Sequence, residues 1–335
     1  MIDAPVTSRG ARRSEFRPSA SHGSGRGRAA RAAERGRRGS SFRRTENRAG
    51  YLFLSPWLLG FFGLTAGPML VSLYLAFTDY NLFNPPQWVG LDNFVELFHD
   101  PQYLQSVGVT LTYVVIGTPL KLASALGVAM LLNRSSRVQG FYRSALYVPS
   151  LLGASVSIAI VWKAMFSNGG VVDEILSAVG IHLGGWVGSV TLAMPMMIIL
   201  ACWQFGAPMV IFLAGLKQIP GELYEAASLD GAGAFRKFIG VTLPMLGPVL
   251  LFNLILDTIG SFQIFAPAYI ISGGQGGPAG ATMFYTLYLY IQGFTDFRMG
   301  YASAMAWLLV VVLGIVTYLF FRSSKSWANY TGGEE

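Results

Sequence analysis

Residues 51–77, YLFLSPWLLGFFGLTAGPMLVSLYLAF, form the first long apolar segment of the chain and decide its fold. The segment contains no charged side chain. A helix needs about 20 mainly apolar residues to cross the hydrocarbon core of a bilayer. The segment is too long for the apolar core of a secretory signal peptide. It therefore predicts a membrane-spanning helix.

Five further apolar segments of similar length follow, each bounded by charged or turn-forming residues. Hydrophobic residues make up 53% of the 335 residues and charged residues only 12%, about half the usual share of roughly 25% in soluble domains. Several segments contain proline, which a packed bundle of membrane helices tolerates. We expect an all-α integral membrane protein with six transmembrane helices. The predicted spans are residues 51–77, 107–132, 145–166, 190–216, 246–271 and 300–321.

The charges between the spans predict the orientation of the chain. Residues 1–50 carry 13 arginines against 4 acidic residues, whereas the rest of the chain carries 11 basic and 13 acidic residues. Residues 78–106 and 167–189 contain acidic but no basic residues, and the break after the second span contains Arg134, Arg137 and Arg143 but no acid. Basic loops stay on the cytoplasmic side. Both termini are therefore expected in the cytoplasm.

The composition predicts three regions. Residues 1–50 have few large apolar side chains and are expected to form a disordered basic cytoplasmic tail. Attachment to anionic lipid and an organellar transit peptide are the alternatives. Residues 51–322 form the six-helix domain, and residues 323–335 form a cytoplasmic C-terminal tail.

Two segments before the last span need separate interpretation. Residues 281–294, ATMFYTLYLYIQGF, are too short to span and rich in aromatic residues. They are expected to form a short helix lying at the outer membrane interface. The glycine-rich residues 272–278 are expected to be a flexible external turn, because no strand precedes them as a phosphate-binding loop requires.

Sequence motifs of enzymes are absent. The single cysteine, Cys202, excludes a disulfide scaffold, and His22, His99 and His182 do not have metal-ligand spacing. None of the five lysines follows a glycine, so the chain lacks the Gly-Lys-Ser/Thr of a P-loop. We therefore expect no catalytic residues, no metal site and no cofactor bound by this chain. Energy for transport would come from a partner or a coupled ion.

The most informative segment is the polar loop of about residues 217–245. Pro220 suits the first position of a helix, Glu222 suits its positively polarised end, and Gly231 is a natural stop. These signals predict a helix of about ten residues, a turn, and a second short helix leading into the membrane. On these grounds alone, an ordinary connector and a docking element both remain open.

The same residues carry a resemblance. Glu225-Ala226-Ala227, Asp230-Gly231-Ala232 and Leu243-Pro244 resemble the EAA loop of permease subunits of binding-protein-dependent ABC importers. The chain resembles in particular the sugar-importer branch, the maltose and glycerol-phosphate type, over residues 51–322. Further matching fragments are residues 77–80 (FTDY), 89–94 (VGLDNF), 215–224 and 300–304 (GYASA).

The resemblance implies the type I ABC importer permease architecture in a bacterial inner membrane. It implies four kinds of partner: a second, different permease, two cytoplasmic ATPase subunits that use ATP, an external solute-binding protein, and a sugar substrate. Nucleic acid is not expected as a partner. The implied ATPase-coupling residues are Glu225, Ala226, Ala227, Asp230, Gly231, Leu243 and Pro244.

Polar residues inside the spans are candidates for the substrate path, because such residues usually face the bundle interior or a water-filled cavity. Asp257 is the only acidic residue deep in a span and is expected to face either the substrate or a residue of the partner permease. Lys121, also within a span, is expected to pair with an acid or to reach toward the interface. The candidate path residues are Trp203, Gln204, Asn253, Asp257, Ser261 and Gln263.

These observations favour an importer of a neutral sugar. A glycerol-phosphate or glycerophosphodiester importer of the same architecture is the alternative, but a phosphate ligand favours basic residues along the path. The fourth and fifth spans contain none. An ion-coupled secondary transporter, which often shows inverted repeats, and a membrane enzyme are less well supported.

Overall fold

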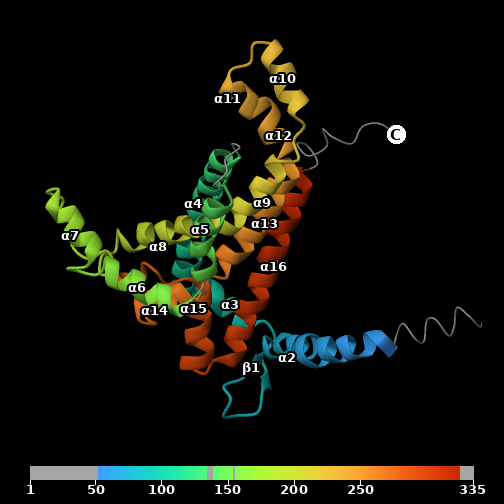
Figure 1. The fold of residues 1–335 in the computed structure, drawn as a ribbon. Coiled ribbons are helices and arrows are strands. Elements are labelled where there is room, and N and C mark those ends of the chain that lie inside the picture. The colour runs from blue at the N-terminus through green and yellow to red at the C-terminus, as the bar shows by residue number, and fades with distance from the viewer. Residues whose placement is uncertain (1–51, 134–138, 154, 325–335) are drawn as a thin grey trace, which may run out of the picture. The chain divides into compact units, whose positions relative to one another are not determined.

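The computed structural model describes residues 52–133, 139–153 and 155–324 (Figure 1). The predicted basic tail, Arg134, Arg137 and most of the predicted C-terminal tail lie outside the described residues. The described part is almost entirely helical, with one pair of two-residue strands. The chain divides into two compact units, residues 1–68 and 69–335.

The described part of the first unit is helical from Leu52 onward. It contains the π-helical turn η1 (Phe61–Ala66), and the helix continues to the end of α2 (Gly67–Leu75). The whole helix Leu52–Leu75 is long and apolar enough to span a membrane. None of its most apolar window is buried within the chain. Such a surface needs cover from lipid or from another subunit.

Helix α4 (Pro101–Leu132) is the central element of the second unit, where it packs against α8, α9 and α13 (Figure 1). Asp100 caps the start of the helix, and its side chain accepts a hydrogen bond from the backbone N–H of Gln102. It runs unbroken through Pro119, because packed neighbours tolerate a proline inside a membrane helix. The last helix, α16 (Met299–Ser324), is also continuous.

Three of the predicted spans are divided into two helices. The third consists of α5 (Gln139–Leu152) and α6 (Val156–Phe166), which is followed by α7 (Val171–Ala178); the stretch 156–178 is bent by 91° from α5. The fourth consists of α8 (Ala193–Trp203) and α9 (Gly206–Leu216), bent by 44°. In the fifth, α13 (Gly247–Phe262) is followed by α14 (Ala266–Ser272). Counting each bent pair as one span gives the six spans that the sequence predicts.

Side-chain hydrogen bonds replace backbone bonds at the break in the fourth span. The Ser150 hydroxyl donates to the Gln204 carbonyl at 2.9 Å and accepts from the Ala207 N–H at 3.0 Å. The Gln204 side chain in turn donates to the Gly153 carbonyl, at the break in the third span. Broken helices are tolerated at membrane depth where neighbouring groups satisfy the freed backbone in this way. The prolines of the fourth span, Pro195 and Pro208, lie within the two helices and not at the break.

The connection between the first span and α4 contains a short hairpin and a helix. Strands β1 (Thr78–Asp79) and β2 (Gln87–Trp88) pair antiparallel and precede α3 (Asp92–His99). The Asn93 side chain donates to the carbonyls of Ala76 and Thr78 at 2.9 and 3.0 Å. A Cβ atom at Gly300 would lie only 2.0 Å from the Thr78 carbonyl oxygen. Three of the fragments on which the family resemblance rests, residues 77–80, 89–94 and 300–304, therefore meet here and fix this loop.

The prediction for residues 281–294 is half wrong. The segment does form helical structure, α15 (Tyr285–Tyr290) and the π-helical turn η4 (Ile291–Thr295). However, Phe284, Leu287 and Tyr288 are buried inside the chain, so this segment does not lie on the membrane interface. Tyr285 and Tyr288 belong to a core cluster with residues of α4 and α16. The glycine-rich turn before it contains the 3₁₀ turn η3 (Pro278–Gly280).

The polar loop before α13 contains four short helices (Figure 1). They are α10 (Gly221–Leu229), α11 (Ala234–Lys237), the π-helical η2 (Phe238–Thr242) and α12 (Leu243–Met245).

Candidate functional site

A polar cavity of about 410 Å³ lies among the breaks of the spans. Its walls come from α4, the end of α5, the α8–α9 break, and the end of α13 with the start of α14. Four of the six predicted path residues line it, namely Gln204, Asp257, Ser261 and Gln263. The breaks make the cavity possible, because they interrupt the continuous helix surfaces that would otherwise pack closely.

An ion pair between two spans forms one wall of this cavity. The ammonium nitrogen of Lys121 on α4 donates to Oδ1 of Asp257 on α13 at 2.6 Å. Both side chains are mostly buried, with 19% and 15% of their surface exposed. One helical turn away on each helix, the hydroxyls of Thr118 and Ser261 lie 2.9 Å apart. These two pairs join α4 to α13 through polar groups.

The prediction that Lys121 pairs with an acid is confirmed. That Asp257 also faces the substrate or a residue of the partner permease stays a prediction. The partner of Asp257 lies in its own chain. The second carboxylate oxygen, Oδ2, is buried and has no hydrogen-bond partner among the described residues. Asp257 therefore has the capacity to accept a further hydrogen bond, which is costly to leave unused in a buried position.

The two other predicted path residues do not line the cavity. The Trp203 ring packs against Trp162, with ring centroids 5.7 Å apart, in the apolar cluster between α6 and α8. Asn253 is buried and donates to the carbonyl of Val249 on its own helix at 3.1 Å. The spacing of four residues places Asn253 and Asp257 on roughly the same helix face. The neighbours of α13 then bury Asn253 among apolar side chains.

Sequence reasoning missed Tyr113 and Gly153 as lining residues and left Lys121 out of the path. A signal for Lys121 was present in the sequence, since Asp257 is the only acidic residue deep in a span and needs a counter-charge. No comparable signal marks Gly153. It lines the cavity because its carbonyl accepts from Gln204 across the chain.

The segment with the EAA-like residues projects away from the spans on the side where α9 ends (Figure 1). Helix α10 follows Pro220, which caps the helix and is not its first residue as predicted. The helix ends at Asp230, and Gly231 then adopts the left-handed conformation with a φ of 73°. Glycine is the residue that takes this conformation without strain, so Gly231 stops the helix as predicted.

Helix α10 has no buried residue and is held by hydrogen bonds to the following segment. The hydroxyls of Tyr224 and Thr242 lie 3.0 Å apart, and the Lys237 ammonium group donates to the Ser228 hydroxyl at 2.7 Å. Glu225, Ala226 and Asp230 are exposed. Leu223 and Leu229 are also exposed, Leu229 to 90%. A short helix with this much apolar exposure is typical of a docking surface.

A third feature is a hydrogen-bond network around Asp100, at the N-terminal end of α4. Asp100 accepts hydrogen bonds from the hydroxyls of Tyr288 and Tyr301, the second at 2.7 Å. Burial raises the pKa of Asp100, but the hydrogen bonds from Tyr288, Tyr301 and the backbone outweigh it and hold this pKa below its usual value of 3.8. Nearby, Arg298 pairs with Glu96 and lies 4.4 Å from the centre of the Tyr301 ring. The network ties α3, α15 and α16 to the start of α4.

Comparison with known proteins identifies the fold and the family. Residues 122–326 match the family described as binding-protein-dependent transport system inner membrane component. The chain belongs to this family. The match covers every predicted EAA-loop residue and all of the cavity-lining residues except Tyr113 and Lys121. This permease is thus a multi-pass inner membrane component of a binding-protein-dependent transport system.

Named relatives cover nearly the whole permease. It is 48% identical over 294 residues to the probable ABC transporter permease protein YesP of Bacillus subtilis, covering 87% of this chain and 95% of YesP. It is 32% identical to the lactose transport system permease protein LacF of Rhizobium radiobacter, covering 85% and 97%. Its fold is similar to a chain of a bacterial alginate ABC transporter solved with an alginate pentasaccharide-bound periplasmic protein. That likeness has a TM-score of 0.70 at 22% identity and covers 85% and 96% of the two chains. The expected type I importer permease fold is therefore confirmed.

Proposed function

We propose that this chain is a permease subunit of an ATP-driven importer for a neutral sugar or oligosaccharide. The observation that carries the proposal is the polar cavity at the span breaks. Among the described residues that line it, the two charged ones, Lys121 and Asp257, neutralise each other. The remaining polar side chains, Tyr113, Gln204, Ser261 and Gln263, are uncharged donors and acceptors. A sugar presents hydroxyl groups that such side chains bind.

The charge balance of the cavity also argues against a phosphate-bearing substrate. Phosphate groups favour arginine or lysine partners with free charge. Within the part of the chain that the structure describes, Lys121 is the only cation that lines this cavity, and it is paired with Asp257. The names of relatives support the sugar assignment, since LacF is named for lactose and the AraP protein of Bacillus subtilis, 31% identical, for arabinooligosaccharides.

The proposed coupling element is α10 with the turn that follows it. Glu225, Ala226, Ala227 and Gly231 would contact a cytoplasmic ATPase subunit, with Asp230, Leu243 and Pro244 shaping the segment. ATP would be bound by two such subunits and not by this chain. A second, different permease and an external solute-binding protein would complete the transporter. Both termini, including the basic tail 1–50, would lie in the cytoplasm.

Reconstitution tests this proposal. The permease is expressed with its partner permease, ATPase and binding protein, and the complex is placed in proteoliposomes. ATP is supplied on the side of the ATPase subunits, and ADP takes its place in the control. We expect ATP-dependent uptake of a neutral oligosaccharide from a panel that also contains a uronate oligosaccharide and glycerol phosphate. Uptake restricted to the phosphate or uronate compounds would overturn the neutral-sugar assignment. ATP-independent uptake would overturn the coupling assignment.

A further inference from the structure

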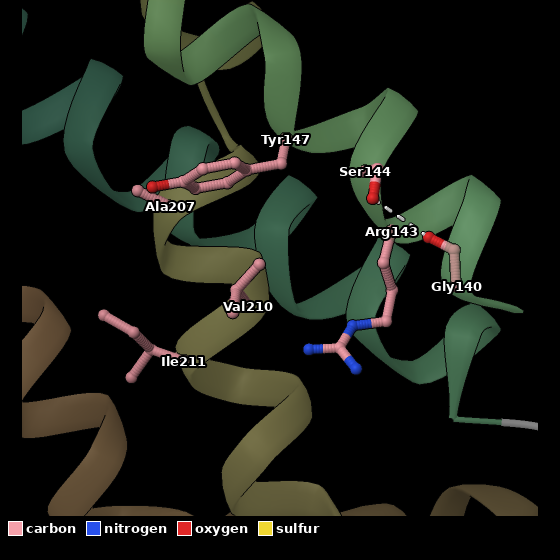
Figure 2. Close-up of a pocket in the computed structure, with 7 residues that line it drawn as sticks. All are labelled: Gly140, Arg143, Ser144, Tyr147, Ala207, Val210 and Ile211. Atoms are coloured by element: carbon pink, nitrogen blue, oxygen red, sulfur yellow. Dashed lines mark hydrogen bonds between the residues drawn. The ribbon is translucent and has the colours of Figure 1, made fainter.

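A second cavity, of about 540 Å³, lies between α5 and α9, apart from the polar cavity described above. Figure 2 shows side chains that line it: Arg143 and Tyr147 come from α5, and Val210 and Ile211 come from α9. Ser144 lies beside Arg143 and donates its hydroxyl to the Gly140 carbonyl at 3.2 Å. The cavity thus has a polar part around Arg143 and Ser144 and an apolar part formed by Tyr147, Ala207, Val210 and Ile211.

Arg143 is a cation without an acidic partner. Among residues 52–133, 139–153 and 155–324, the ion pairs are Lys121–Asp257 and Glu96–Arg298. The side chain of Arg143 is half-buried against apolar residues. The ten residues 134–143 contain three arginines and no acid, so the sequence around it supplies no counter-charge. The first turn of α5 also lacks acidic residues, and its N-terminal end is positively polarised.

The position of Arg143 across the bilayer indicates which lipid region surrounds this cavity. Helix α9 ends at Leu216 and leads within a few residues into α10, so the cavity lies toward the α10 side of the spans. The uninterrupted apolar part of the third span begins just after Ser144. Arg143 therefore lies where the hydrocarbon region meets the headgroup region.

Aromatic residues at the same level support a lipid neighbour. Phe141 and Tyr142 are exposed to 72% and 51%, and their rings lie 6.0 Å apart beside Arg143 on α5. Exposed aromatic residues next to a basic residue at a helix end are typical of a membrane interface. Basic pockets between membrane helices on the cytoplasmic side bind anionic headgroups.

We propose that the cavity between α5 and α9 binds an anionic phospholipid of the leaflet on the α10 side. Arg143 contacts the headgroup phosphate, and one acyl chain lies along Tyr147, Val210 and Ile211. Such a lipid has a polar headgroup and apolar chains, which match the polar and apolar parts of the cavity. Because α9 leads directly into the proposed coupling helix, an occupied cavity stabilises the junction of α5 and α9 on the side where the coupling helix lies. This site is independent of the sugar path.

Native mass spectrometry of the purified, detergent-exchanged transporter complex tests the proposal with added phosphatidylglycerol or phosphatidylcholine. We expect the wild-type complex to retain phosphatidylglycerol in preference to phosphatidylcholine. Arg143→Gln should lower phosphatidylglycerol retention roughly 5-fold, because one cation facing an anionic lipid is removed. Arg143→Lys should retain most of the binding. The matched control is Arg322→Gln, which removes an exposed cation near the end of α16.

A second variant separates loss of charge from loss of structure. Val210→Phe fills the apolar part of the cavity and leaves Arg143 in place, so it should also lower lipid retention. Equal retention of phosphatidylglycerol by the wild type, Arg143→Gln and Val210→Phe would overturn the proposal. Displacement of the bound lipid by millimolar inorganic phosphate would identify a simple anion site instead. Loss of the partner permease from the Arg143→Gln complex, with lipid retention unchanged, would assign Arg143 to the subunit interface and would also overturn it.

Discussion

Lys121 on α4 and Asp257 on α13 are 136 residues apart in the sequence, and their charged groups meet at 2.6 Å on the wall of the polar cavity. Neither side chain is fully buried, so the pair is partly hydrated. The pair has two consequences: it neutralises the charge of the cavity wall, and it joins the continuous helix α4 to α13.

Removal of one partner should destabilise the complex more than removal of both. Asp257→Asn leaves Lys121 without its counter-charge, and we expect a loss of about 1–3 kcal/mol, less than for a fully buried pair. The double variant Lys121→Met/Asp257→Leu should recover most of this loss. The measurement is thermal unfolding of the purified complex.

Sugar uptake by the same variants tests the path assignment. If Asp257 contacts the sugar, Asp257→Asn should raise the half-saturating sugar concentration, and the double variant should not restore it even where stability returns. Ser261→Ala removes one hydroxyl and no charge from the same cavity, so its comparison with Asp257→Asn separates the effect of the charge from the loss of a single hydrogen-bonding group. Normal uptake and normal stability in Asp257→Asn would show that Asp257 has no part in the path.

The coupling segment should be sensitive to the backbone conformation at Gly231. A Cβ atom at Gly231 meets nothing within 4 Å, but the φ of 73° strains any other residue except asparagine by roughly 1–2 kcal/mol. Gly231→Leu should therefore lower ATPase binding and substrate-stimulated ATP hydrolysis. Gly233→Ala adds a Cβ atom in open space at an ordinary φ of −70° and should have little effect. Equal loss in both variants would refute the conformational explanation.

Glu225→Lys tests the chemistry of the proposed ATPase contact. The side chain is exposed, so the change should leave insertion and folding intact while placing the wrong charge in the contact. We expect loss of co-purification with the ATPase subunits. Glu222→Lys, on the first turn of the same exposed helix, is the control for a general effect of charge. Co-purification at wild-type level in Glu225→Lys would remove Glu225 from the contact.

Tyr224→Phe should loosen α10 without changing its surface. The variant removes the hydrogen bond to Thr242, which contributes about 1 kcal/mol in a typical protein. We expect fewer sugar molecules imported per ATP hydrolysed, with ATPase binding retained. The ratio of uptake to hydrolysis in proteoliposomes measures this. A ratio equal to that of the wild type would show that the hydroxyl contact does not position the helix.

The network at Asp100 makes a prediction about acid stability. Because the pKa of Asp100 is lowered in the folded protein, its carboxylate stabilises the fold above the usual value of 3.8 and loses this contribution as the pH falls below it. Tyr288→Phe removes one donor and should raise this pKa toward its usual value. The variant should therefore unfold at a higher pH during acid titration than the wild type. An unchanged acid midpoint would contradict the prediction.

The sequence by itself determined the features that depend on local chemistry. Span number follows from the length of apolar segments, and the end of α10 follows from Gly231, since both depend on residues close together in the chain. Deletion of residues 2–48, which lie outside the described residues, should accordingly leave transport intact, because their composition cannot form a core.

Only the tertiary structure decided which distant groups meet. The sequence marked Lys121 and Asp257 as costly inside a membrane, but periodicity carries no information on which helix packs beside which. Aromatic side chains such as those of residues 281–294 suit a membrane interface as well as a protein core, and tertiary packing buried Phe284, Tyr285 and Tyr288. The span breaks depend on hydrogen bonds from other helices, such as that from Ser150 to the Gln204 carbonyl. Such bonds become available only once the helices have assembled, which is why the cavity is a property of the folded chain.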